Sequence, residues 1–505
     1  MTSLPTRPAK ARASLPERAE ANRVRPAALG AASRIPRDPV HRGGVGWRSR
    51  VSTVTRLLGF LLLLGFFAGP LKAAPVVGHD LAVELNPERG TLSVRDTLTL
   101  PEAHASREFI LHRGLDPRVV SDNALLRSIG ERGHLAAYRL RRTGPGPITL
   151  TYAGTIRSDL ETVRESMGRS RQRSRGTIGA DNVVLDGGSG WYPRFPGTLV
   201  RFTLQVQVPD GWTAVSQGAG PEIAQRAGAT SISWQESHPQ DDVYLIAAPF
   251  SRYALETPHG EAQVYLRTAD ASLAQRYLDA TARYLDLYSR LIGPYPYAKF
   301  ALVENSWETG YGMPSFTLLG PRVIRFPFIL HSSYPHEILH NWWGNGVFVD
   351  YATGNWCEGL TAYMADHLIQ EQRDKGRNYR RDTLQKYRNY VKDERDFPLE
   401  EFRSRHSAAT EAVGYGKSLM LFHMLRRELG DRGFSNALAR LWQRHRFEAI
   451  GFTQALHTLL QEQPALLPHY QAWLETTASP RLELSDVRLD RSGERYRLQL
   501  QVLQH

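Results

Sequence analysis

The chain has 505 residues, a net charge of +12 and an apolar content of 41%, which allows two or three domains with cores of their own. The charge is uneven, because residues 1–56 hold twelve Lys and Arg against three Asp and Glu and the rest is close to balanced. This argues against nucleic-acid binding, which requires a basic surface on a folded domain. The single cysteine excludes an internal disulfide.

Residues 1–56 are rich in Arg, Ala and Pro, and we expect them to be disordered. An apolar run of about a dozen residues follows, short for a membrane span of about twenty. It has a basic flank before it and ends in small residues near Ala74, which is typical of a secretory signal. We therefore expect 57–74 to be a signal peptide, or an anchor that holds the chain to a membrane through 57–69. Either alternative predicts export to the periplasm or the extracellular space.

Residues 75–268 have the pattern of strands. Apolar and polar residues alternate with period two in several runs, and turn residues separate them. The runs lie at 81–85, 148–156, 202–208 and 230–237. An all-β sandwich or saddle domain is predicted. Within it, the Gly-, Ser- and Arg-rich stretch 157–190 is expected to be a solvated loop.

Residues 269–476 have helical periodicity, with apolar residues at steps of three and four. Helices are predicted over 271–292, 335–345 and 357–371, with a strand at 300–303 after the first of them. Beyond them, 477–505 is predicted to hold two strands that begin a further β module, since two strands alone are marginal.

The sequence His-Glu-Ile-Leu-His at 336–340 carries the chemistry. Side chains at i and i+4 of a helix face the same way, so His336 and His340 could hold one Zn²⁺. Glu337 would then take a proton from a zinc-bound water, and a third protein ligand is required. Glu358, separated from His340 by seventeen residues on a second apolar-periodic segment, is the natural candidate.

Two further motifs flank this site: Gly293-Pro-Tyr-Pro-Tyr-Ala-Lys-Phe300 upstream and Tyr415-Gly416-Lys417 downstream. With the zinc motif they resemble the aminopeptidase N family of gluzincin metallopeptidases over about 75–475. The resemblance implies an α+β multidomain chain, with an N-terminal β domain followed by a thermolysin-like, mainly helical catalytic domain.

The resemblance also implies roles for individual residues. His336, His340 and Glu358 would bind a single Zn²⁺, and Glu337 would be the general base. Tyr415 would stabilise the oxyanion, with a purely packing role as the alternative.

The chain departs from the family at its substrate loop. The family's Gly-x-Met-Glu-Asn reads Gly310-Tyr-Gly-Met-Pro-Ser here, and Pro314 stands where the family has the Glu that holds a substrate amine. We expect Gly312 and Met313 to line the substrate site and Glu308 to supply a substitute anion. The interval between the second His and the Glu ligand is also one residue shorter than the family's eighteen.

The predicted function is that of a zinc-dependent peptidase of aminopeptidase type acting on exported peptides. A zinc endopeptidase, another zinc hydrolase on the same scaffold and an inactive binding homologue are the alternatives. The intact ligand set disfavours the last of these. No nucleic-acid partner is expected, and membrane contact is expected only through the N-terminal anchor.

Overall fold

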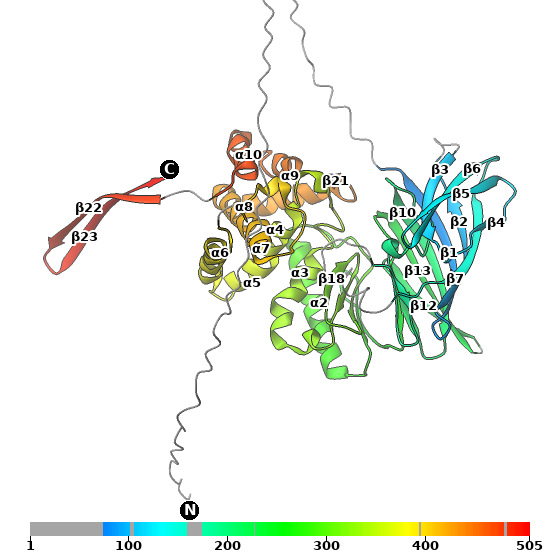
Figure 1. The fold of residues 1–505 in the computed structure, drawn as a ribbon. Coiled ribbons are helices and arrows are strands. Elements are labelled where there is room, and N and C mark those ends of the chain that lie inside the picture. Colours follow the sequence, from blue (N-terminus) through cyan, green and yellow to red (C-terminus); the bar gives the residue numbers. More distant parts are fainter. Residues whose placement is uncertain are drawn as a thin grey trace, which may run out of the picture. The chain divides into compact units, whose positions relative to one another are not determined.

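The computed structural model describes residues 74–101, 106–158, 174–226, 228–392, 395–478 and 482–504. The basic segment 1–56 and the signal or anchor, apart from Ala74, lie outside these ranges. Among the described residues, no helix combines the length and apolarity needed to cross a membrane. Figure 1 traces the chain from the strands of the first part to the helices of the second.

The N-terminal β domain is built on a twisted seven-stranded sheet. Its strands bury every second residue, as Val77, Leu81 and Leu85 show in β1, because side chains alternate between the two faces of a strand. The central strand β1 pairs in parallel with β10 and antiparallel with β2. In spatial order the strands are β12 (Ala219–Arg226), β13 (Ala229–Gln240), β10 (Leu199–Pro209), β1 (Val76–Asn86), β2 (Thr91–Thr99), β7 (Ile148–Thr155) and β4 (Arg118–Val119).

Two smaller sheets complete this domain. One is three-stranded, with β3 (Ser106–His112), β6 (Leu135–Arg142) and β5 (Ala124–Arg132). The other is four-stranded, with β11 (Thr213–Val215), β14 (Leu245–Ala248), β9 (Val183–Leu185) and β8 (Thr177–Ile178). The expectation of a solvated loop over 157–190 is wrong for its second half. There β8 and β9 are buried strands, and Trp191 and Tyr192 directly after them are fully buried.

A five-stranded sheet separates the β core from the helical core. Residues of β17 alternate between the two, since Leu302 packs with the helices and Val303 with the β domain. The order is β15 (Ser251–Leu255), β16 (Glu261–Leu266), β17 (Lys299–Glu304), β19 (Phe316–Leu319) and β18 (Gly310–Met313). The edge strand β18 contains the substrate loop, so this sheet fixes the loop relative to both cores.

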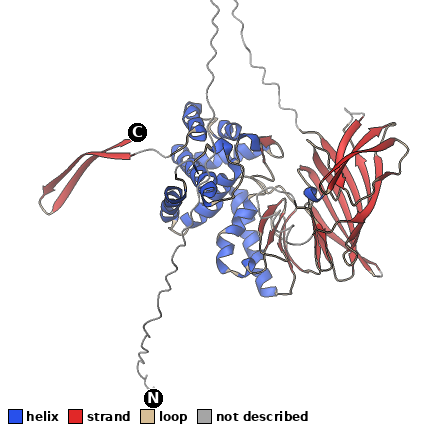
Figure 2. Cartoon of the chain, viewed as in Figure 1, coloured by secondary structure: helices blue, strands red, loops and turns tan. Residues whose placement is uncertain are grey.

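The second part is mainly helical (Figure 2). Its first helix begins at the cap Asp270, whose side chain accepts a hydrogen bond from the Leu273 amide at 2.9 Å. The helices are α2 (Ala271–Leu291), α3 (Ser333–Leu339), α4 (Trp356–Ala362), α5 (Leu368–Glu371), α6 (Gly376–Tyr390), α7 (Ala408–Glu411), α8 (Ser418–His445), α9 (Phe452–Leu459) and α10 (Leu467–Glu475). Two π-helical turns, η5 (Tyr363–His367) and η8 (Ala412–Lys417), lie between α4 and α5 and between α7 and α8, and a short ladder pairs β20 (Phe348–Val349) with β21 (Ala449–Ile450).

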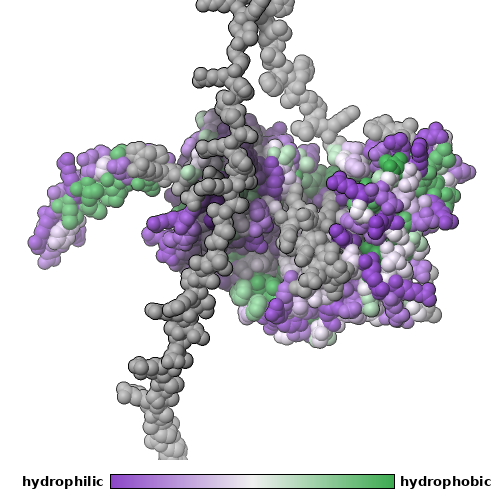
Figure 3. All heavy atoms as spheres, viewed as in Figure 1, coloured by the Kyte–Doolittle hydropathy of each residue, from purple (hydrophilic) through white to green (hydrophobic). Residues whose placement is uncertain are grey.

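The last described element is a hairpin of β22 (Leu482–Ser492) and β23 (Arg495–Gln504). Its large apolar side chains are exposed and alternate along β23 at Tyr496, Leu498, Leu500 and Val502, so these four share one face; apolar residues appear green along the hairpin in Figure 3. The predicted fold class, a sheet-rich N-terminal domain followed by a helical domain, is confirmed.

Candidate metal centre and active-site cavity

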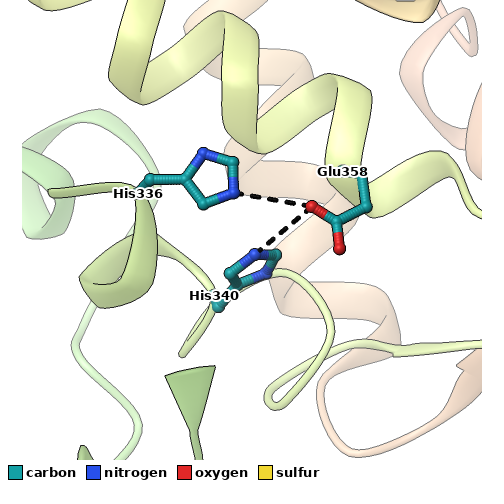
Figure 4. Close-up of side chains that lie close together, drawn as sticks. All are labelled: His336, His340 and Glu358. Atoms are coloured by element: carbon teal, nitrogen blue, oxygen red, sulfur yellow. Dashed lines mark ion pairs between the residues drawn. The ribbon is translucent and has the colours of Figure 1, made fainter. Parts of the chain in front are cut away.

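Three side chains from two helices converge on one point (Figure 4). His336 lies in α3, His340 caps its C-terminal end, and Glu358 lies in the first turn of α4. One oxygen of Glu358, Oε2, is 3.5 Å from His336 Nε2 and 3.6 Å from His340 Nε2. Ligand atoms roughly 2.0–2.2 Å from a tetrahedral zinc ion are themselves separated by roughly 3.3–3.6 Å.

The environment of this group fits a metal ion. Glu358 Oε2 is buried and, apart from the long contacts with the two histidines, has no hydrogen-bond partner among the described residues, which is costly for a carboxylate oxygen unless a cation accompanies it. Burial opposes the ionisation of Glu358, but the two histidines hold the pKa of its carboxyl well below the usual range. Two imidazoles and one ionised carboxylate are a donor set typical of catalytic zinc.

Both imidazoles are oriented through their other nitrogen. His336 Nδ1 is 2.9 Å from Asp366 Oδ2, and His340 Nδ1 donates to the Trp343 carbonyl oxygen at 3.0 Å. These contacts hold Nε2 of each ring toward Glu358, as outer partners of metal-bound histidines do. The sequence reasoning missed Asp366, although it lies eight residues after Glu358, two helical turns along the same face.

The helix that carries the histidines is shorter than predicted. We expected it to extend over 335–345, but α3 ends at Leu339. The Asn341 side chain donates to the Ile338 carbonyl oxygen at 2.8 Å and thereby takes an acceptor at the helix end. Its Oδ1 accepts the Ser315 amide at 2.7 Å. Asn341 therefore connects the end of the histidine helix to the substrate loop.

The substrate loop packs directly against Glu337. A Cβ atom added to Gly312 would lie 2.5 Å from Glu337 Oε2 and 3.5 Å from the His340 Cβ. Met313, the next residue, is buried and also borders the cavity. Burial raises the pKa of the Glu337 carboxyl, although His340 and His336 oppose this. A carboxylate with a raised pKa beside the metal group has the properties of a general base.

A buried lysine fixes the far end of this loop. Lys299 donates from Nζ to the carbonyl oxygens of Ser216 and Ser315, at 2.9 and 3.1 Å, and to the Ser315 hydroxyl at 2.9 Å. The ammonium also lies 5.0 Å from the Trp234 ring centre. Ser315 itself has a positive φ of 63°. The loop conformation is thus held from both the β domain and the histidine helix.

Tyr415 lies on the other side of the metal group. Its ring stacks on His336 with 6.3 Å between centres and meets Phe402 edge-on at 6.0 Å. Burial and the Glu358 carboxylate raise the pKa of the phenol, so it keeps its proton as a hydrogen-bond donor. Tyr415 lies in η8 and Asp366 in η5, and π-helical turns are frequent at functional sites.

Glu308 is placed differently from the other predicted residues. It borders the same cavity, but Oε1 accepts from Nε and the amide of Arg322 at 2.9 and 3.0 Å. Its Oε2 accepts the Val323 amide at 3.3 Å. The hydrogen bonds from Arg322 help hold the pKa of Glu308 below its usual range, so the group is ionised. Its charge is already shared with a guanidinium, which weakens its attraction for a substrate amine.

All of the predicted site residues border a single cavity of about 1360 Å³ between the β and helical parts. The β domain contributes Asp186, Asp241 and Tyr244, and α6 with the segment before α7 contributes Lys386, Arg403 and Arg405. Such a volume exceeds what a single amino acid fills, and it accommodates an extended peptide.

Residues 332–472 match the family model described as the peptidase family M1 domain. This match confirms the resemblance to the aminopeptidase N family of metallopeptidases for that part of the chain. Zinc is the metal named for a similar solved structure, an M1 zinc metallopeptidase from Deinococcus radiodurans, and the group of His336, His340 and Glu358 fits this ion.

The relatives are distant and longer. Rice aminopeptidase M1-B (Oryza sativa subsp. japonica) is 22% identical over 346 residues, 63% of this chain and 39% of the relative. Mouse aminopeptidase B (Mus musculus) is 26% identical over 184 residues, 34% of this chain and 27% of the relative. The chain thus spans about two fifths or less of these curated relatives.

A solved structure of a mutant M1 zinc metallopeptidase from Deinococcus radiodurans, bound to a Tyr-Ser-Ala substrate, is similar in fold. Its TM-score is 0.60 at 21% identity, with 81% of this chain and 95% of that chain covered. The two-domain fold is therefore shared almost throughout that enzyme.

Proposed function

We propose that this chain is a zinc-dependent peptidase that removes residues from the amino termini of short peptides. The observation that carries the proposal is the convergence of His336, His340 and Glu358 beside Glu337 in a peptide-sized cavity. These three side chains would hold the metal. Zinc, when bound, supplies a Lewis acid and lowers the pKa of a coordinated water toward ~7.

The protein's own groups perform the proton transfers in this proposal. Glu337 accepts a proton from the attacking water and passes it to the leaving amine, a contribution of ~10²–10⁴-fold. Tyr415 donates its phenolic hydrogen to the oxyanion that forms on the scissile carbonyl, which is typically worth ~3 kcal/mol. Gly312 leaves room for Glu337 and, with Met313, borders the path of the substrate.

Aminopeptidase specificity is supported by the relatives, among which aminopeptidases predominate, and by the tripeptide in the similar fold. Glu308 is proposed to attract the substrate amine, with Arg322 limiting its strength. Export of the chain is proposed from the sequence pattern of 57–74 alone.

The test compares zinc-loaded protein on matched peptides with free and with N-acetylated amino termini, with products identified by mass. Aminopeptidase activity predicts stepwise release of single residues and loss of cleavage on acetylation. Equal cleavage of both peptides would contradict amino-terminal recognition and identify an endopeptidase. No cleavage of either peptide would contradict the peptidase proposal itself.

A further inference from the structure

Of the four Lys and Arg residues that border the cavity, three lie on one wall, and the fourth, Arg201, lies in β10. Lys386 lies in α6, and Arg403 and Arg405 lie in the segment before α7, next to Tyr415. Between Lys386 and Arg405 lies one acid, Glu411, at 3.3 and 3.4 Å from their nitrogens. With three cations and one anion, this wall has a net positive charge.

The two arginines are used differently. The Arg403 guanidinium donates to the carbonyl oxygens of Glu400, Phe402 and Ala352 at 2.6, 3.2 and 3.0 Å. It is therefore occupied in holding the main chain. Arg405 has one ion pair among the described residues, the long contact to Glu411, and its side chain is 58% exposed. Since a guanidinium has five N–H donors, most of those of Arg405 face the cavity and the solvent.

The position of Arg405 relative to the metal group is defined by Tyr415. The guanidinium carbon is 5.8 Å from the Tyr415 ring centre, and that ring is 6.3 Å from the His336 ring centre. Together these distances limit the separation of the guanidinium from the metal-ligand ring to about 12 Å, and an extended peptide spans roughly 3.3–3.6 Å per residue. A carboxylate bound by Arg405 would thus lie one to three residues from the scissile bond.

We propose that Arg405 binds the C-terminal carboxylate of short peptides, so that the substrates are di- to tetrapeptides with a free C-terminus. This inference rests on the proposed peptidase function and deepens it by naming the substrate class. A planar guanidinium matches a carboxylate with two parallel hydrogen bonds, which Lys386 cannot reproduce as a point charge. Glu411 holds Arg405 in place until the substrate carboxylate arrives.

An alternative role for Arg405 gives a different kinetic result. Its charge opposes the rise in the pKa of Tyr415, so it could act only by making the phenol a better donor. In that case, loss of Arg405 would lower kcat for every substrate to the same extent. A carboxylate-binding role instead predicts that loss of Arg405 raises KM only for substrates with a free carboxylate.

The experiment uses the zinc-loaded full chain with trialanine, its C-terminal amide and alanine p-nitroanilide. Wild type should cleave the acid with kcat/KM roughly tenfold above the amide, the effect of one charge-assisted pair at a half-exposed site. Arg405→Met should abolish this preference through KM for the acid and leave the amide and the anilide within about twofold of wild type. Arg405→Lys should restore part of the preference.

Lys386→Met is the matched control, because it removes a cation of the same wall that also contacts Glu411. It should keep the preference for the acid. Equal rates of wild type on acid and amide, or an equal loss on all three substrates in Arg405→Met, would overturn the carboxylate site while leaving the peptidase proposal intact. Absence of hydrolysis of all three substrates by wild type would overturn the peptidase function and this inference with it.

Discussion

The contact between Gly312 and Glu337 predicts a large catalytic effect from one added methyl group. In Gly312→Ala the new Cβ would lie 2.5 Å from Glu337 Oε2, whereas carbon and oxygen atoms in contact are normally separated by roughly 3.3–3.6 Å. The carboxylate must therefore retreat by about 1 Å, and a misplacement of this size typically costs ~10²-fold in rate. That corresponds to ~2.7 kcal/mol of transition-state stabilisation.

The same substitution should leave folding and zinc binding intact. The displaced atom is at the end of a flexible side chain, and of the three proposed zinc ligands only His340 is among the nearest neighbours of the added methyl group, with Cβ and Cδ2 at 3.5 Å, an ordinary contact. The assay measures kcat on a chromogenic aminoacyl substrate, zinc per chain and thermal unfolding.

Gly310→Ala provides the matched control, since Gly310 lies on the same strand β18 and its added Cβ would meet only Leu319 Cδ2 at 3.7 Å. It should retain near wild-type activity. A kcat for Gly312→Ala within about threefold of wild type, or an equal loss in Gly310→Ala, would refute the role assigned to the Gly312–Glu337 contact.

Three other changes have separate expected results. Tyr415→Phe should lower kcat by ~10²-fold with little change in KM and full zinc content, because the lost bond forms mainly in the transition state; unchanged kinetics would leave Tyr415 a packing residue. Asp366→Asn should weaken zinc affinity by ~10–100-fold through His336, measured by competition with a chelator, and unchanged affinity would exclude this role. Burial lowers the pKa of Lys299 to about 7, so above that pH the unfolded chain binds the additional proton and stability rises with pH. Between pH 7 and 9 wild type should therefore gain about 2 kcal/mol of unfolding free energy relative to Lys299→Met in denaturant titrations, and parallel curves for the two proteins would contradict the shift.

Local patterns predicted the elements whose burial follows a simple period. Strand β10 and helix α2 follow from alternation and from steps of three and four, because each has one face in a single core. The burial of residues 174–190 could not be predicted from periodicity. Their glycines and serines are buried because the main chain packs closely against neighbouring groups. Gly187, for example, has no room for a Cβ beside Asp242.

The residues of the candidate site likewise fall into those that a local sequence pattern predicts and those that depend on tertiary packing. His336 and His340 could be predicted because two donors at helical spacing can share one metal ion, and Glu358 because such a site requires a third donor. Asp366 lies at a helical spacing from Glu358 that could have suggested it, whereas the position of Arg405 depends on the packing of a loop beside Tyr415. Glu308 was nearest in sequence to the lost amine-binding position, but the sequence did not show that Arg322 would pair with its carboxylate.

The most direct test of the zinc-peptidase account is the Glu337→Gln variant, assayed for bound zinc and for peptide hydrolysis in the same preparation. Glu337 is not among the three metal-binding side chains, and an amide cannot accept the proton of the attacking water. The account predicts one zinc ion per chain, as in wild type, with hydrolysis reduced by at least ~10²-fold. Retained hydrolysis, or loss of the zinc ion, would contradict it.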